Sequence, residues 1–159
     1  MKYFLAYLIR GAAEKYHREV IRRVADEFNE NHMLENPLPP HITLKAPFKT
    51  TNIRGLEKLL DEFTKRHHQG RISIKEFGNF ERTIIFLNAK FDKLSKKIQK
   101  DLIEELKSLT INPGEYDISH SPHATVAYCD ENNFDSIWGY LQEQSEAPCG
   151  KTTGHLEII

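Results

Sequence analysis

Cysteine is scarce in this chain, and its scarcity excludes several kinds of site. The only two cysteines, Cys129 and Cys149, have no metal-ligand spacing, and one pair is too few for the disulfide framework of a small secreted protein. We therefore predict two free thiols, with no metal site and no cofactor.

Long apolar runs and an excess of one charge are also missing. The apolar stretches, such as residues 3–9, are too short to span a bilayer, and the N-terminus lacks a secretory signal. With 22 Lys and Arg against 23 Asp and Glu, the chain has no basic field that would bind duplexes non-specifically. A soluble, cytoplasmic protein without a membrane partner is predicted, in which any contact with nucleic acid is local.

The hydrophobic periodicity predicts both helices and strands. Apolar residues three and four apart indicate helices, and runs rich in β-branched and aromatic residues indicate strands. A turn near Gly78 and Asn79 joins two of the strands in a hairpin, and Asn52 is a candidate helix cap. Helices are expected at 14–31, 52–68, 91–109 and 134–144, and strands at 2–9, 41–48, 71–77, 83–88, 123–129 and 152–159.

The order of these elements repeats. Strand, helix, strand and helix follow one another before Gly70 and again after it, which favours two similar lobes over one doubly wound sheet. No linker divides the chain. We therefore predict a pseudo-symmetric α+β fold in which residues 1–159 form a single domain with a shared core.

Two short motifs have the same pattern. Residues 40–44 read Pro-His-Ile-Thr-Leu and residues 122–126 read Pro-His-Ala-Thr-Val, each at the start of an expected strand. Because side chains alternate between the faces of a strand, His41 shares a face with Thr43, and His123 with Thr125. If the lobes face each other, two imidazoles and two hydroxyls converge on a cleft.

This set of groups suits the hydrolysis of a phosphodiester. One neutral histidine accepts a proton from the attacking oxygen, while the other, protonated, donates one to the leaving oxygen. The threonine hydroxyls can donate to the non-bridging oxygens and stabilise the charge of the transition state. The alternative is that both histidines are ordinary strand residues, and that the threonines only favour β structure.

Several other residues are weaker candidates. Lys45 shares the expected face of His41 and could add charge beside a phosphate, and Arg82 could reach a phosphate from the hairpin; a solvated surface position is the alternative for both. Phe48, Phe80 and Tyr128 could stack on a base or simply pack. His120 lies three residues before His123, but no carboxylate or thiol cluster completes a metal site.

The paired motifs, 82 residues apart, resemble those of the two-histidine (2H) phosphoesterase superfamily, which includes 2′-5′ RNA ligases and cyclic nucleotide phosphodiesterases. The resemblance implies a bilobal fold of two antiparallel sheets with flanking helices and a central cleft, and a metal-free mechanism. It also implies that His41 and His123 are the general acid and base, that Thr43 and Thr125 bind the phosphate, and that substrates bear a 2′,3′-cyclic phosphate or a 2′-5′ linkage.

Three functions remain open at this point. The first is hydrolysis of 2′,3′-cyclic phosphates of RNA ends or nucleotides to 2′-phosphates, with 2′-5′ ligation as the related reverse reaction. The second is a non-catalytic module that binds RNA ends or a phosphorylated ligand in the same cleft, and the third is action on a non-nucleotide ester. No heptad pattern or exposed apolar segment indicates self-association, so a monomer is expected.

Overall fold

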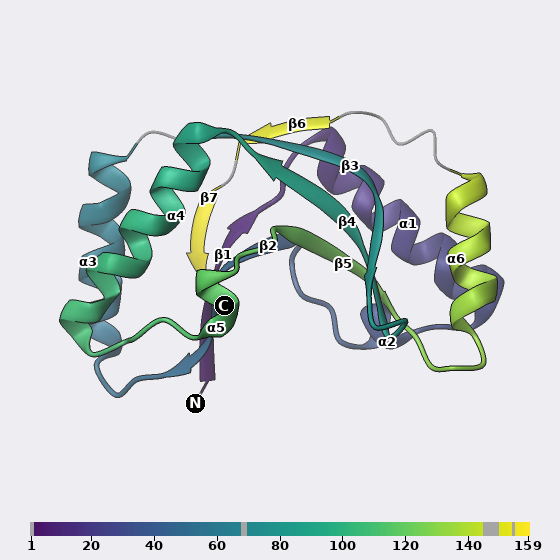
Figure 1. Ribbon diagram of the computed structural model, residues 1–159, viewed down its shortest axis with the longest axis horizontal. Coiled ribbons are helices and arrows are strands. Elements are labelled where there is room, and N and C mark those ends of the chain that lie inside the picture. The colour runs from purple at the N-terminus through teal and green to yellow at the C-terminus, as the bar shows by residue number, and fades with distance from the viewer. Residues whose placement is uncertain (1, 68–69, 145–149, 154) are drawn as a thin grey trace.

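The expected strands form two antiparallel sheets in the computed structural model, which describes residues 2–67, 70–144, 150–153 and 155–159 (Figure 1). The predicted α+β class is therefore confirmed. In chain order the elements are β1 (Lys2–Leu8), α1 (Ala12–Phe28), α2 (His32–Glu35), β2 (His41–Lys49), α3 (Ile53–Arg66), β3 (Arg71–Phe80), β4 (Ile84–Phe91), α4 (Lys93–Leu106), the 3₁₀ turn η1 (Lys107–Leu109), α5 (Glu115–Ile118), β5 (His123–Tyr128), α6 (Phe134–Glu143), β6 (Gly150–Thr153) and β7 (His155–Ile158).

The two sheets repeat one arrangement of strands. One sheet has the order β2-β1-β7 and the other has the order β5-β4-β3-β6. In each, a central strand leads through a long helix to the strand that carries a histidine motif: β1 leads through α1 to β2, and β4 leads through α4 to β5. This order confirms the predicted pseudo-twofold relation, and it puts both motif strands at the edge of their sheet.

The long helices are exchanged between the two halves of the chain. Helix α1 packs against β5 and β6, and its Phe28 contacts Tyr140 of α6. Helix α4 packs beside α3 and reaches β2 through Gln99. Figure 1 accordingly shows α1 with α6 at one end of the molecule and α3 with α4 at the other. Each half therefore covers part of the other.

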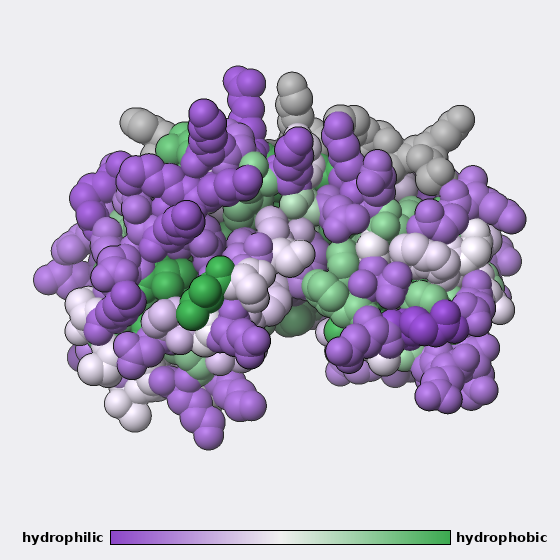
Figure 2. Space-filling model, in the orientation of Figure 1, coloured by the Kyte–Doolittle hydropathy of each residue, from purple (hydrophilic) through white to green (hydrophobic). Residues whose placement is uncertain are grey.

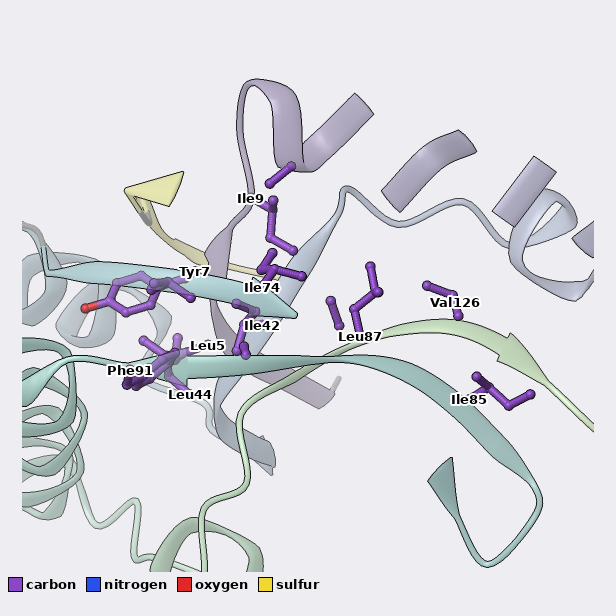
Figure 3. Close-up of a cluster of buried hydrophobic side chains, with 14 of the residues drawn as sticks. Leu5, Tyr7, Ile9, Ile42, Leu44, Ile74, Ile85, Leu87, Phe91 and Val126 are labelled. Atoms are coloured by element: carbon purple, nitrogen blue, oxygen red, sulfur yellow. The ribbon is translucent and has the colours of Figure 1, made fainter. Parts of the chain in front are cut away.

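Apolar side chains of both halves form one buried cluster (Figure 3). The first half contributes Leu5 and Ile42, which are fully buried, and the second half contributes Leu87 and Val126, which are equally so. Ile42 and Val126 lie on the motif strands, and Leu5 and Leu87 lie on the strands paired with them, so packing in the core holds the motif strands in place.

Helix ends follow the sequence closely where a cap defines them. Asn52 caps α3 as predicted, because its Oδ1 accepts a hydrogen bond of 3.0 Å from the Gly55 amide. The helix ends at Arg66, and the predicted end at His68 lies outside the described residues. Cys129 is a free thiol as predicted, while Cys149 lies outside the described residues.

The predicted hairpin exists, but its turn was placed wrongly. Strand β3 continues through Gly78 to Phe80, and Glu81 and Arg82 make the turn with positive φ angles of 47° and 60°. Gly78 is needed inside the strand because the ring of Phe86 crosses it: a Cβ there would lie 2.4 Å from a ring carbon.

The C-terminal segment and two short helices also differ from the prediction. The single closing strand expected at 152–159 is two strands, β6 beside β3 in one sheet and β7 beside β1 in the other. The four-residue helices α2 and α5 were not predicted, since a single turn has too few residues to show a helical period.

Candidate active site

A cavity of about 580 Å³ lies between the two lobes, and all four motif side chains line it. His41 and Thr43 reach it from β2, and His123 and Thr125 reach it from β5. Figure 2 shows the molecule hollowed between its lobes. The structure therefore brings together the residues that the paired motifs suggested.

Alternation along each strand explains this placement. Ile42 and Ala124, the residues between histidine and threonine, are fully buried in the core. The histidine and threonine on either side of each one must then face away from the core. Strands β2 and β5 lie close to each other without forming one sheet, so these opposite faces share the cavity.

The two imidazoles are held in the same way. Nδ1 of His41 lies 2.8 Å from the carbonyl oxygen of Pro39, and Nδ1 of His123 lies 2.7 Å from that of Ser121. Because a carbonyl oxygen only accepts, Nδ1 carries the proton in both rings. This leaves Nε2 of each ring as the nitrogen that can exchange a proton with a ligand.

The proline before each histidine explains this anchor. A proline biases the preceding residue to an extended conformation, and this conformation turns that residue's carbonyl toward the imidazole two positions later. Both motifs share this Xaa-Pro-His segment, at 39–41 and at 121–123. The tautomer of both histidines therefore follows from a local feature of the sequence.

Burial lowers the pKa of both motif histidines below the ordinary value of 6.5, against the opposing effect of the carbonyl bonds. The positive charges that His120 and His41 can carry lower the pKa of His123 further. Near neutral pH both rings are therefore mainly neutral in the free protein. A bound anion would favour the charged form of one of them.

Aromatic rings flank both imidazoles. Phe4 of β1 lies 5.1 Å from the His41 ring, and Phe86 of β4 lies 4.8 Å from the His123 ring. Phe80 meets the His123 ring edge-on at 4.9 Å. These apolar contacts exclude water from one side of each imidazole, which is the burial that lowers its pKa.

Tyr116 of α5 is a site residue that the sequence did not indicate. It lines the cavity, and its hydroxyl lies 3.4 Å from Nδ1 of His123. Because Nδ1 of His123 carries its proton, the Tyr116 oxygen can only accept from it. Burial raises the pKa of Tyr116 to about 12, so the hydroxyl keeps its own proton, which it can donate to a ligand. No motif includes Tyr116, because it comes from a short helix that only the tertiary fold brings to β5.

The remaining lining residues are mostly apolar, and among the described residues none that lines the cavity is a lysine, arginine, aspartate or glutamate. One wall is formed by α2 and the segment that leads from it to β2, which the sequence also did not indicate. This wall contributes His32, Met33, Asn36 and Leu38. The titratable groups of the lining are therefore histidines and tyrosines.

The expectation that Lys45 faces the cavity is wrong. A β-bulge lies directly after the motif threonine, since Thr43 pairs with Ala6 and Lys45 with the adjacent Leu5. The extra residue, Leu44, reverses the alternation, and the Lys45 side chain becomes 4% exposed in an ion pair of 2.8 Å with Asp117.

The same bulge occurs in the second motif strand. Thr125 pairs with Phe86 and Ala127 with the adjacent Ile85, so Val126 is the extra residue. Ala127, at the position equivalent to Lys45, is fully buried. In both strands the side chain two positions after the threonine is thus buried and does not face the cavity.

Arg82 is also directed away from the cavity. Its guanidinium forms an ion pair of 2.8 Å with Asp135 and lies 4.6 Å from the centre of the Phe134 ring. Both partners belong to α6, and Arg82 does not line the cavity. Arg82 is therefore a surface residue, which was the alternative to a phosphate contact.

Of the three aromatic candidates, two line the cavity. Phe80 and Tyr128 do so, and Tyr128 is 43% exposed, with its ring 4.7 Å from that of His32. Phe48 packs beside Tyr3 instead, at 6.5 Å between ring centres. The two candidates that can contact a ligand thus come from β3 and β5.

Among the described residues, no three histidine, cysteine, aspartate or glutamate side chains cluster so that they could hold a metal ion. His120, considered above beside His123, is bonded instead to the backbone of β2: its Nε2 lies 2.8 Å from the Thr43 carbonyl oxygen.

In the part of the chain that the structure describes, none of the helices is both long and apolar enough to cross a membrane.

Comparison with protein-family models identifies the family of this chain. A family model described as the 2′-5′ RNA ligase superfamily matches residues 15–158, whereas no individual curated protein matches the chain. A structure of Usb1 from Kluyveromyces marxianus is similar at 11% identity and a TM-score of 0.48, covering 99% of this chain and 93% of that one. A second structure, of the same protein with uridine monophosphate, is similar at 12% identity and a TM-score of 0.49. It covers 99% of this chain and 92% of that one. Because the family model spans both histidine motifs, the chain belongs to the 2′-5′ RNA ligase superfamily of two-histidine phosphoesterases.

Proposed function

We propose that this protein hydrolyses 2′,3′-cyclic phosphates, at RNA ends or in nucleotides, to 2′-phosphates. The observation that carries the proposal is the pair of imidazoles in one cavity, each with Nδ1 bonded to a carbonyl oxygen and Nε2 left for proton transfer. A general acid and a general base are what the hydrolysis of a cyclic diester needs.

The proposed reaction is an in-line displacement. A water oxygen bonds to phosphorus while the bond from phosphorus to O3′ breaks. Nε2 of one histidine takes the proton of the water, and Nε2 of the other gives its proton to O3′. If a 5′-hydroxyl attacks in place of water, the product is a 2′-5′ linkage, which is the related ligation.

The threonines complete the proposed site. Thr43 and Thr125 flank the cavity from opposite strands, and their hydroxyls can donate to the two non-bridging oxygens. Such donors stabilise charge that increases in the transition state. In this proposal one of the two histidines is the base and the other is the acid, and either assignment fits the geometry.

The charge of the cavity supports a diester as the substrate. With no lysine or arginine among the described lining residues, the positive charge that faces the phosphate is that of a protonated histidine. A diester carries one negative charge, and one imidazolium balances it. A phosphomonoester near neutral pH carries almost two, and one imidazolium would leave part of that charge unbalanced.

The experiment that tests the proposal is turnover of 2′,3′-cyclic nucleotides and of RNA with a cyclic phosphate end, in EDTA, with the position of the product phosphate assigned. His41→Ala and His123→Ala should each abolish turnover. His67→Ala is a matched control, because His67 stacks on Phe63 of α3 at 4.0 Å and does not line the cavity.

Two results would contradict the proposal. A strict need for an added divalent ion would replace the metal-free mechanism with metal-assisted catalysis. No turnover by the wild type, together with tight binding of RNA ends that both alanine variants retain, would favour the non-catalytic binding module.

A further inference from the structure

Two histidines outside the motifs bind the backbone of the motif threonines. Nε2 of His17 lies 2.8 Å from the carbonyl oxygen of Thr125, and Nε2 of His120 lies 2.8 Å from that of Thr43. Because a carbonyl accepts, each Nε2 donates, and both bonds can form with a neutral ring.

The two bonds are reciprocal between the halves of the chain. His17, on α1 of the first half, is 108 residues from its partner in the second motif. His120, from the second half, is 77 residues from its partner in the first motif. Each motif strand is thus tied to the half of the chain that carries the other motif.

The position of the threonines explains why their carbonyls need such partners. Strands β2 and β5 are both edge strands, and the bulge after each threonine interrupts the ladder at that point. A carbonyl at a partly buried strand edge must find a donor outside the sheet. The imidazoles of His17 and His120 supply it.

Both imidazoles are at least partly buried. His17 is 3% exposed, and the half-buried ring of His120 packs against Phe91 at 5.5 Å. Burial lowers the pKa of both histidines, so both rings are neutral while they donate. Neither histidine lines the cavity and each Nε2 is bonded to a carbonyl, so neither ring is placed to exchange a proton with a ligand there.

We propose that His17 and His120 are positioning residues that set the separation of the two motif threonines, and with it that of His123 and His41. The inference rests on the proposed function for its kinetic test. In-line displacement needs the two Nε2 atoms on opposite sides of one phosphate, so a small shift of either strand misplaces the acid or the base.

The kinetic test compares two substitutions at His120. His120→Phe keeps a planar ring and removes the donor, and should lower kcat by about 10- to 100-fold with KM changed by less than about 3-fold. His120→Gln keeps a nitrogen donor and should retain kcat within about 3-fold, with a bell-shaped pH profile. The same pair of substitutions at His17 should behave alike.

Other kinetic results would overturn the inference. If His120→Phe melts at a lower temperature but keeps kcat, the bond has a structural role only. If His120→Gln loses as much activity as His120→Phe, or loses one limb of the pH profile, His120 acts through its own proton and not through position.

A second readout does not depend on turnover. His17 is not among the charges that shift the pKa of His123, whereas His41 is. NMR titration of His123 in His17→Phe should therefore show its pKa rising toward 6.5 as the strands separate, and His17→Gln should match the wild type. An unchanged pKa of His123 in His17→Phe would reject the positioning role, while absent turnover in the wild type alone would reject only the proposed function.

Discussion

At the scale of the residue, the motif histidines differ from surface histidines because a carbonyl fixes each ring. Pro40 and Pro122 create this anchor through their effect on the preceding residue, so the Pro-His step is as much part of the site as the imidazole itself. Chemistry that depends on one tautomer is thus encoded over three consecutive residues.

The pH dependence of kcat/KM should be bell-shaped with its maximum on the acidic side of 6.5. Burial disfavours the imidazolium, so each motif histidine loses its proton at a lower pH than an exposed one. A bound phosphate favours the imidazolium, so the alkaline limb of kcat should lie at higher pH than that of kcat/KM. Initial rates from about pH 4 to pH 9 would measure both profiles, and an alkaline limb of kcat/KM above 6.5 would contradict the assignment.

Each motif threonine should contribute through its hydroxyl. Thr43→Val and Thr125→Val keep the shape and the preference for β structure, and should each lower kcat by about 10²-fold through loss of one donor. Thr43→Ser and Thr125→Ser retain the hydroxyl and are the matched controls. Steady-state kinetics on a cyclic nucleotide would show the difference, and equal rates for valine and serine variants would remove the threonines from the mechanism.

The placement of the motif residues in one cavity could be predicted from the sequence because their pattern is local. For His41, Thr43, His123 and Thr125 it needed only alternation along a strand and the repeat of one pentapeptide. Tyr116, His17 and His120 could not be found in this way, since each acts on a residue that only the tertiary fold brings near. The placement of Lys45 failed for a different reason: a bulge is not visible in the hydrophobic pattern.

At the scale of the element, α5 closes the open edge of β2. Asp117 accepts a hydrogen bond of 2.7 Å from the Ala46 amide and another of 2.7 Å from the Gly114 amide, in addition to its ion pair with Lys45. A single carboxylate thus fixes one turn of helix to the edge strand that carries the first motif.

Removing this carboxylate should destabilise the protein strongly. Asp117→Ala leaves the ammonium of Lys45 and two amides without their partner in a buried place, and should cost about 3–5 kcal/mol. Asp61→Ala breaks an exposed ion pair with Lys65 and should cost less than about 1 kcal/mol. Urea unfolding of both variants would test this, and similar losses for the two would contradict the structural role given to Asp117.

Gly78 should matter for activity because of the ring that crosses it. In Gly78→Ala the new methyl group would meet Phe86, whose ring packs against His123, so the imidazole should shift. We expect a loss of about 1–3 kcal/mol in stability and a fall in kcat. Gly78→Ala with Phe86→Leu should restore part of the stability, and an unaffected kcat in Gly78→Ala would show that the ring can move without His123.

The long helices and strands could be predicted from the sequence, but the pairing of strands within the sheets could not. The helical period identified α1, α3, α4 and α6 within a few residues, and the hairpin of β3 and β4 followed from its apolar strands. The pairing of β6 and β7 with different sheets depends on neighbours far along the chain. The exchange of α1 and α4 between the halves has the same long-range origin.

At the scale of the whole molecule, stability should decrease in acid. The pKa of His17 is lowered to about 4 in the folded state, against 6.5 when unfolded. As the pH falls from 6.5 toward 4, the unfolded state takes up a proton at His17 and the folded state does not. The free energy of unfolding is therefore unaffected by His17 above pH 6.5 and falls by on the order of 3 kcal/mol across this window. His17→Gln should flatten the pH dependence in this window, as measured by urea unfolding; an equal slope in both proteins would exclude His17 as the source.

Each motif strand is capped by a histidine of the opposite half, and this has a consequence for unfolding and aggregation. When the halves separate, β2 and β5 lose their covering side chains at the same moment, and two unpaired strand edges become available to other chains. The geometry of the proposed site and the protection against aggregation therefore depend on the same contacts between the halves. On heating, activity should disappear together with solubility, and not before it.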